Sequence, residues 1–290
     1  MIENLAKEYI EERLAPPEYR NMEGSLIGHS VDDNIYRIVP FTQFLSMLVN
    51  DENTLVHPSC WKDPFEKQLN NYFVKTIEGN EEHLGNFEAN RWYAQCWSFQ
   101  KDSDGLWRSF TNNKNVRSVK IQSTIKQLLD SYKPSKTCKT EMYLCNVYYS
   151  PEGEYDKNIS LLSKDYQIFL YKGMEPDSKA EEIQFVNELS ILTLKRDAFS
   201  YEHECRLLAY RPQCYKKPSW RYKMDINELA TSIEFDPWTP EYEQDFYKKL
   251  LEEKLGYKGE ISFSHLYDEL KRKRTLRIEK RTPTAHQTRP

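Results

Sequence analysis

The sequence predicts a mixed α+β protein with one large domain, and two observations support that class. Segments of strand composition and segments of helical spacing follow one another without the regular alternation of a parallel fold. No stretch rich in proline, glycine or serine divides the 290 residues. We therefore expect a catalytic-like α+β domain over residues 31–270. An N-terminal amphipathic helix with its connector occupies residues 1–30, and a basic tail occupies residues 271–290.

Element by element, hydrophobic spacing and turn residues give the expected order. Strands are expected at residues 34–40, 54–59, 91–100, 116–121, 141–150, 198–210 and 232–237. Helices are expected at residues 2–14, 41–50, 63–77, 104–112, 122–132, 158–173, 177–196 and 239–256. Asp63 is the expected N-cap of its helix, and Pro64 is its first residue.

The composition is that of a folded protein and argues against several functional classes. Aromatic residues make up 13% of the chain, whereas a disordered chain would be poor in them. The nine glycines form neither a Gly-x-Gly-x-x-Gly sequence nor a phosphate loop, so neither of these nucleotide sites is expected. The cysteines form no Cys-x-x-Cys pair, and we see no secretory signal or membrane-length apolar run. These features predict a cytoplasmic protein with reduced thiols.

The net charge of −4 conceals an asymmetry between the body of the chain and its end. Residues 271–290 carry eight lysines or arginines and one acid, while the remainder carries 33 basic and 44 acidic residues. Basic tails of this kind contact nucleic acid or an acidic partner. A solvated tail without a partner is the alternative.

Three charged residues interrupt the otherwise apolar segment at residues 198–210. On a strand, Glu202, Glu204 and Arg206 share one face, because side chains alternate. Carboxylates two residues apart on a strand lie roughly 7 Å from each other. That spacing allows one carboxylate to bind the sugar of a substrate while the other takes part in the reaction. The alternative is a solvated strand face with a Glu–Arg pair.

Aromatic residues surround a serine in the middle of the chain. Ser98 lies on an expected strand between Trp97 and Phe99, and Trp107 and Phe110 share one face of the following helix. Aromatic rings beside a strand serine can form the wall of a pocket for a flat ring. The alternative for each ring is an ordinary place in the core.

Two further stretches carry polar residues near the start of the expected domain. Tyr36 and Arg37 lie on the first expected strand, where Arg37 is a candidate for binding a phosphate or ribose. A surface arginine is the alternative. The stretch Lys62–Glu66 reads KDPFE, which is also the start of an ordinary helix.

The order of these motifs resembles that of a bacterial family named domain of unknown function 2971, over roughly residues 34–210. The Asn-Asp-Pro-Phe-Glu motif of that family is similar to Lys62–Glu66, and its Cys-Phe-Ser to Cys96–Ser98. Its Met-Trp-x-x-Tyr looks like Leu106–Phe110, and its Tyr-Glu-x-Glu-x-Arg is matched by Tyr201–Arg206. The chain departs from the pattern at Lys62, Leu106 and Phe110.

The layout of this family is similar in turn to the ADP-ribosyltransferase fold, which has a central, mainly antiparallel split sheet flanked by helices. The resemblance implies NAD as the co-substrate. It implies that Glu204 binds the ribose and stabilises developing positive charge, while Glu202 orients or deprotonates the acceptor. The cofactor-binding residues that it implies are Tyr36, Arg37, Trp97, Ser98, Trp107 and Phe110.

The resulting interpretation is an NAD-dependent ADP-ribosyltransferase that modifies a macromolecule. The basic tail favours RNA or DNA over protein as the acceptor. By analogy, such an enzyme is a bacterial toxin in a toxin–antitoxin or antiphage system, with an antitoxin or chaperone as partner. Two alternatives remain open. One is a metal-dependent nucleic-acid-processing defence protein that uses Glu202 and Glu204 with Asp63 or Glu66, and the other is a non-catalytic interaction module.

Overall fold

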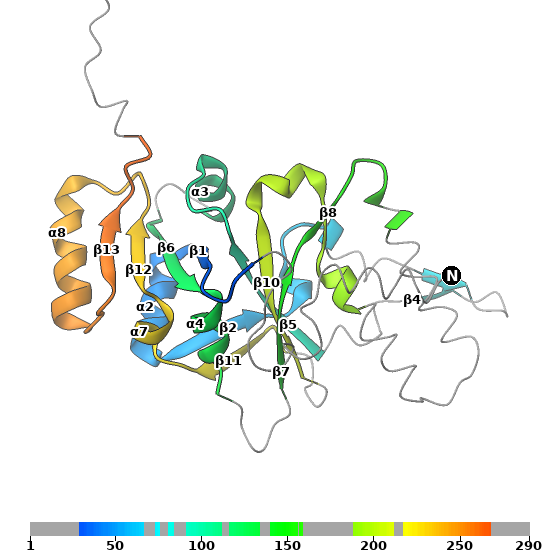
Figure 1. The fold of residues 1–290 in the computed structure, drawn as a ribbon, viewed down its shortest axis with the longest axis horizontal. Helices are drawn as coiled ribbons and strands as arrows, with labels where there is room; N and C mark the ends of the chain where they lie inside the picture. Colours follow the sequence, from blue (N-terminus) through cyan, green and yellow to red (C-terminus); the bar gives the residue numbers. More distant parts are fainter. Residues whose placement is uncertain are drawn as a thin grey trace, which may run out of the picture.

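The computed structural model describes residues 29–66, 73–75, 81–83, 91–111, 116–133, 140–155, 157–158, 188–211 and 217–267. In this part of the chain a nine-stranded sheet forms the centre of the molecule, with helices packed around it (Figure 1). The prediction of a mixed α+β fold with a mainly antiparallel sheet is confirmed. The helix expected at residues 2–14, residues 159–173 of the one expected at 158–173, and the basic tail lie outside the described residues.

The sheet has three branches that meet at β5 (Trp92–Ser98), and among its pairs only β12 with β13 is parallel. The first branch is β1 (Asn34–Pro40), β6 (Ser118–Thr124), β12 (Ser232–Phe235) and β13 (Glu260–Phe263). The second is β10 (Glu204–Tyr210) followed by β7 (Glu141–Asn146), and the third is β2 (Glu52–Val56) followed by β11 (Ser219–Lys223).

The sheet is split because β1 and β2 share one edge of β5. Tyr36 of β1 lies opposite Ser98, whereas Val56 of β2 lies opposite Ala94. The two strands then diverge, which leaves residues 95–97 of β5 without a strand partner on that edge. The opposite edge of β5 pairs along its whole length with β10. This divergence is the split that the family resemblance implied.

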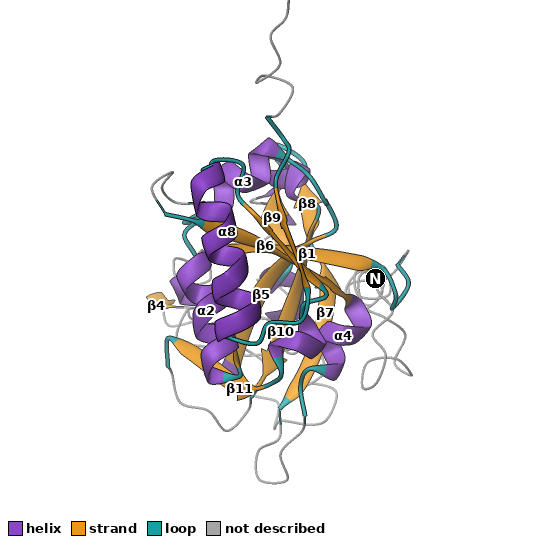
Figure 2. Ribbon diagram, turned by 90° about the vertical axis from the view of Figure 1, so that its left-hand side faces the viewer, coloured by secondary structure: helices purple, strands orange, loops and turns teal. Residues whose placement is uncertain are grey.

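The main core lies between the sheet and four helices, of which α2 and α8 run along one side of it (Figure 2). The helices are α2 (Phe41–Asn50), α4 (Ile125–Asp130), α7 (Ile226–Leu229) and α8 (Glu241–Lys249). In α2, Phe41, Phe44 and Leu48 recur at helical spacing and are buried, and a left-handed Asp51 ends the helix. A capping box between Thr124 and Gln127 begins α4.

Two expected helices are wrong over part of their length. No α-helix forms in residues 61–66, because the Asp63 side chain accepts a hydrogen bond from the backbone N–H of Phe65 and closes a turn instead. Residues Phe73–Lys75 are strand β3, which pairs with β4 (Glu81–His83). The helix expected at residues 177–196 is helical at 188–192. It then gives way to strand β9 (Leu194–Arg196), paired with β8 (Tyr148–Ser150).

The strand expected at residues 198–210 is also wrong in its first half. Residues Asp197–Glu202 form a 3₁₀ helix, η6, and His203 has a left-handed φ of 42° that ends it. Strand β10 begins only at Glu204. Glu202 and Glu204 therefore do not alternate along one strand face, and the spacing argument made for them does not hold.

Candidate functional site

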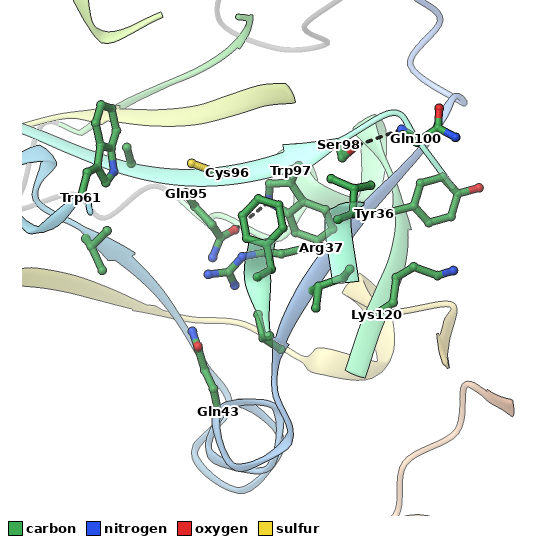
Figure 3. Close-up of a pocket in the computed structure, with 16 residues that line it drawn as sticks. Tyr36, Arg37, Gln43, Trp61, Gln95, Cys96, Trp97, Ser98, Gln100 and Lys120 are labelled. Carbon is green, nitrogen blue, oxygen red and sulfur yellow. Dashed lines mark hydrogen bonds between the residues drawn. The ribbon is translucent and has the colours of Figure 1, made fainter. Parts of the chain in front are cut away.

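A cavity of about 170 Å³ lies where β1 and β2 diverge from β5 (Figure 3). Its walls come from β1, β5 and α2, and from α3 (Asp104–Phe110), whose Ser103 N-cap accepts a hydrogen bond from the N–H of Leu106. Five of the residues predicted to bind a cofactor line it: Tyr36, Arg37, Trp97, Ser98 and Phe110. Trp107 does not line the cavity but is buried beside Ile38 and Leu106, where it supports α3.

Arg37 projects into this cavity without a carboxylate partner among the described residues (Figure 3). Its Nη1 atom is buried and has no hydrogen-bond partner in the described part of the chain. Burial lowers the pKa of Arg37 to about 10, and the nearby Cys96 and Tyr222 offset burial only in part. The guanidinium of Arg37 therefore has a hydrogen-bond donor for which the described residues provide no acceptor.

A buried polar network forms the floor beside Arg37. Gln95 accepts a hydrogen bond from Trp97 Nε1 at 2.8 Å and donates one to Asn53 Oδ1 at 2.6 Å. Asn53 in turn donates to the hydroxyl of Tyr222 at 2.8 Å. The network fixes the indole of Trp97 in the cavity wall. Sequence reasoning missed Gln95, although a polar residue between Tyr93 and Trp97 on a buried strand was a signal.

The hydroxyl of Ser98 serves to join two elements. It donates to the backbone carbonyl of Glu202 at 2.5 Å and accepts from the backbone N–H of Gln100 at 2.9 Å. Tyr36, Ser98 and Glu204 lie opposite one another on β1, β5 and β10, so their side chains share a face of the sheet. Ser98 thus ties η6 to the sheet at the level of the two glutamates.

Glu202 and Glu204 meet at a lysine that the sequence analysis did not identify. Lys195 of β9 places its Nζ 2.5 Å from Glu202 Oε2 and 2.8 Å from Glu204 Oε2. All three side chains are buried. The two carboxylates therefore share one cation, and η6 rather than a common strand face brings Glu202 to Glu204.

The two carboxyl groups have pKa values displaced in opposite directions. Burial alone would raise the pKa of Glu204, but Arg206 and Lys195 outweigh burial and lower it to about 2. Burial raises the pKa of Glu202, and Lys195 offsets this only in part. Glu204 is therefore held ionised, whereas Glu202 is the carboxylate of the pair that more readily takes a proton.

Arg206 is the centre of the cluster and brings distant motifs into contact. Its Nε donates to Glu204 Oε1 at 2.7 Å, its Nη1 donates to the carbonyl of Leu192 at 2.6 Å, and its Nη2 donates to Glu66. Its guanidinium also lies 4.3 Å from the ring centre of Trp61. We call Glu66, Lys195, Glu202, Glu204 and Arg206 the charge cluster.

The charge cluster adjoins the cavity but does not line it. Cys96 lies opposite Arg206 across β5 and β10, lines the cavity and hydrogen-bonds to Glu204. Burial, followed by the charge of Glu204, raises the pKa of the Cys96 thiol well above its ordinary value. The structure thus brings Arg37 and Ser98 to one cavity and leaves Glu204 behind Cys96.

Two alternative interpretations of the glutamates do not match this geometry. Among the described residues, no group of three or more His, Cys, Asp or Glu side chains is arranged to hold a metal ion. Lys195 Nζ occupies the place between Glu202 and Glu204 that a cation would need. A solvated strand face is wrong as well, since Glu204 and Arg206 are buried.

Comparison with known proteins gives one family and a set of distant structures. The model of the family described as "Protein of unknown function (DUF2971)" matches residues 106–207. The resemblance to this family that the motifs predicted is therefore confirmed over that segment. No curated protein matches the chain. No helix in the described part of the chain has the length and apolar character needed to cross a bilayer.

The solved structures that resemble the chain include those of DarT from Thermus sp. 2.9. DarT in complex with ADP-ribosylated ssDNA is 10% identical, covers 80% of this chain and 94% of its own, and has a TM-score of 0.35. The complex with NAD+ is 9% identical, with coverage of 80% and 96% and a TM-score of 0.34. The complex with carba-NAD+ is 9% identical, with coverage of 81% and 96% and a TM-score of 0.33.

Proposed function

We propose that this protein is an NAD-dependent ADP-ribosyltransferase, with residues 31–270 as its catalytic domain. The observation that carries the proposal is Arg37, a guanidinium in a cavity between diverging strands with no carboxylate partner among the described residues. A guanidinium that lines a cavity without a carboxylate partner is expected to bind an anionic ligand. The pyrophosphate of NAD has the required charge.

The cavity fits part of a dinucleotide and not the whole of it. Pockets for complete ligands of this class hold roughly 300–1,000 Å³, whereas this cavity holds about 170 Å³. Trp97 and Phe110 line it and supply apolar faces against which a flat ring can pack. We therefore assign the cavity to one ring or phosphate of NAD, with the remainder of the molecule extending outward.

The glutamates suit the two roles that the reaction requires. When bound, NAD would supply an ADP-ribosyl group through cleavage of its bond to nicotinamide. Glu204, held ionised by Arg206 and Lys195, provides a fixed negative charge beside the cavity. Glu202, with its raised pKa, is the better proton acceptor and takes the proton of the acceptor group.

For the acceptor we propose RNA or DNA, because the basic residues at 271–290 can contact phosphates. A toxin or antiphage role in the cytoplasm, with an antitoxin or chaperone partner, follows by analogy with the family layout. The acceptor is tested separately from the chemistry, by offering RNA, DNA and protein in parallel. Deleting residues 271–290 is expected to reduce transfer to nucleic acid while leaving NAD binding unchanged.

The test of the chemistry is label transfer from NAD carrying a radioactive phosphate. The wild-type protein should label an acceptor, and Arg37→Met should label none. Phe246→Ala is the matched control, because this side chain on α8 is 61% exposed and does not line the cavity. If Arg37→Met transfers label at the wild-type rate, the proposal is wrong.

A second candidate, a non-catalytic interaction module, is favoured by one observation. The oxygens of Glu204 already accept hydrogen bonds from Lys195 and Arg206, as expected of a structural ion-pair network. Glu202→Gln separates the two candidates. Under the transferase proposal it lowers label transfer and alters its pH profile, and under the module proposal the wild-type protein transfers no label.

A further inference from the structure

Tyr201 of η6 packs against α3, the helix that forms one wall of the cavity. Its hydroxyl lies 2.8 Å from the Oγ of Ser109. Its ring covers Gly105, where a Cβ atom would lie 3.1 Å from the ring atom Cε2. Gly105 and Ser109 share one face of α3, because residues four apart in a helix are neighbours. The ring of Tyr201 therefore lies along one turn of α3, and a side chain at position 105 would push it outward.

The neighbouring face of α3 is the one that meets the cavity. Leu106 and Phe110 line the cavity, and they follow directly after Gly105 and Ser109 in the chain. Leu106 is also buried, so this wall belongs to the packed part of the fold. A contact with the adjacent face of α3 therefore fixes the contacting element relative to the cavity.

Tyr201 also directly precedes Glu202 at the end of η6. The backbone carbonyl of Glu202 accepts a hydrogen bond from the hydroxyl of Ser98 at 2.5 Å, and the carbonyl of His203 accepts one from the N–H of Phe99 at 3.0 Å. These two bonds attach the end of η6 to strand β5. Because Tyr201 attaches the same turn to α3, the backbone of Glu202 is held between β5 and α3.

The surroundings of the Glu202 carboxylate depend on where η6 lies. Among the described residues, the charged groups that face Glu202 are Lys195 of β9, Glu204 of β10 and Glu66. Lys195 Nζ lies 2.5 Å from Glu202 Oε2 and 2.8 Å from Glu204 Oε2. Charge interactions in a buried site change steeply with distance. A small movement of η6 would therefore change both the attraction of Lys195 for Glu202 and the exposure of Glu202 to water.

We infer that Tyr201 is a positioning residue, which holds Glu202 in a fixed place relative to the cavity through its contact with Gly105 and Ser109. The expected effect on label transfer rests on the proposed function, whereas the expected effect on Glu202 itself does not. Tyr201 does not line the cavity, so we assign it no contact with NAD. Because Tyr201 is 41% exposed, Tyr201→Phe should keep the fold.

The test is a double-mutant cycle on the hydroxyl pair, in the full chain, with Tyr201→Phe, Ser109→Ala and the double variant. Each single variant removes the same hydrogen bond, so the three variants should behave alike. Loss of one neutral hydrogen bond weakens the fixed arrangement by about fivefold, and kcat for label transfer should fall by a similar factor while KM for NAD changes by less than about twofold. Tyr242→Phe is the matched control, because it removes a tyrosine hydroxyl from a residue that is 82% exposed and does not line the cavity.

A second measurement follows Glu202 and needs no activity. The ¹³C-carboxyl resonance of Glu202, assigned with Glu202→Gln, reports the titration of this side chain. Burial is the main cause that raises the pKa of Glu202, so release of η6 should move that pKa toward the ordinary value of a glutamate in all three variants and leave it unchanged in Tyr242→Phe. The pH profile of label transfer should move in the same direction. A purely structural role of Tyr201 would lower the melting midpoint and leave both the titration and the pH profile as in the wild type.

Failure of the positioning role and failure of the transferase proposal give different results. Label transfer with the same kcat and the same Glu202 titration in wild type and Tyr201→Phe would overturn the positioning role while supporting the transferase. A titration that moves equally in Tyr201→Phe and Ser109→Ala, in a protein that transfers no label, would support the positioning role and contradict the transferase. A titration that moves in one single variant alone would overturn the positioning role, because the effect would not pass through the hydroxyl pair.

Discussion

Replacing Arg37 with methionine is expected to stabilise the ligand-free protein. The side chain is a half-buried cation, and burial of its guanidinium lowers its pKa from the ordinary range of an arginine to about 10. Because a tenfold change in an equilibrium constant is about 1.4 kcal/mol, this difference corresponds to about 3 kcal/mol that the charged form loses on folding. Met keeps most of the apolar stem, so the variant should recover about 1–3 kcal/mol at neutral pH.

The destabilisation caused by the charge of Arg37 depends on pH. Below pH 10, both the folded and the unfolded wild type carry the charge, so the full cost is present at pH 7. As the pH rises through 10 the folded state loses its proton before the unfolded chain does, and the wild type gains stability relative to Arg37→Met. For a domain of this size a gain of about 2 kcal/mol raises the melting midpoint by roughly 5 °C.

Scanning calorimetry and urea denaturation at pH 7 measure the change directly. Arg206→Met is the matched comparison, since it removes a guanidinium that is paired with Glu204 and Glu66. That variant should lose about 3–5 kcal/mol, because two buried carboxylates would lose their partner. If Arg37→Met were instead less stable than the wild type, the guanidinium would have a role within the folded chain, and the argument for a ligand would fail.

Three further changes test other parts of the structure. The free energy of unfolding of the wild type should fall by about 3 kcal/mol as the pH falls from 4.5 through 2, since the folded pKa of Glu204 is about 2. Urea denaturation should therefore show the difference in stability between the wild type and Glu204→Gln shrinking over that range. Lys195→Met should lower the free energy of unfolding by about 3–5 kcal/mol, because Glu202 and Glu204 lose their shared cation; a change below about 1 kcal/mol would contradict a buried network. Gly259→Ala should cost about 1–3 kcal/mol, since its Cβ would lie 2.2 Å from the Tyr257 hydroxyl, and an unchanged melting midpoint would contradict this packing.

The sequence predicted β1 and α2 well. In α2, apolar residues recur at helix spacing on one face, whereas β1 was recognised by its strand composition and is buried on both faces; both elements form at the expected residues. The helix expected from Asp63 failed because its cap closes a turn instead. The strand at residues 198–210 failed at its start because His203 adopts a left-handed conformation, which no periodicity predicts for a histidine.

The candidate site could be predicted only in part, because its contacts are long-range. Arg37 and Ser98 could be chosen as a cationic and a polar residue on apolar strands, and both line one cavity. Lys195 could not be chosen from the sequence, because it falls in an expected helix. It contacts Glu204 only because β9 pairs with β8. Glu204→Gln is not a mild surface change, because Glu204 is 3% exposed.

The most direct test of the central claim is calorimetric titration of NAD into the wild type and Arg37→Met. The claim is that the unpaired guanidinium of Arg37 is reserved for the dinucleotide. We predict that the wild type binds NAD and that Arg37→Met, although more stable, binds it at least about a hundredfold more weakly, as expected for loss of a charge-assisted contact. Equal affinities in the two proteins, or no binding to the wild type, would contradict the claim.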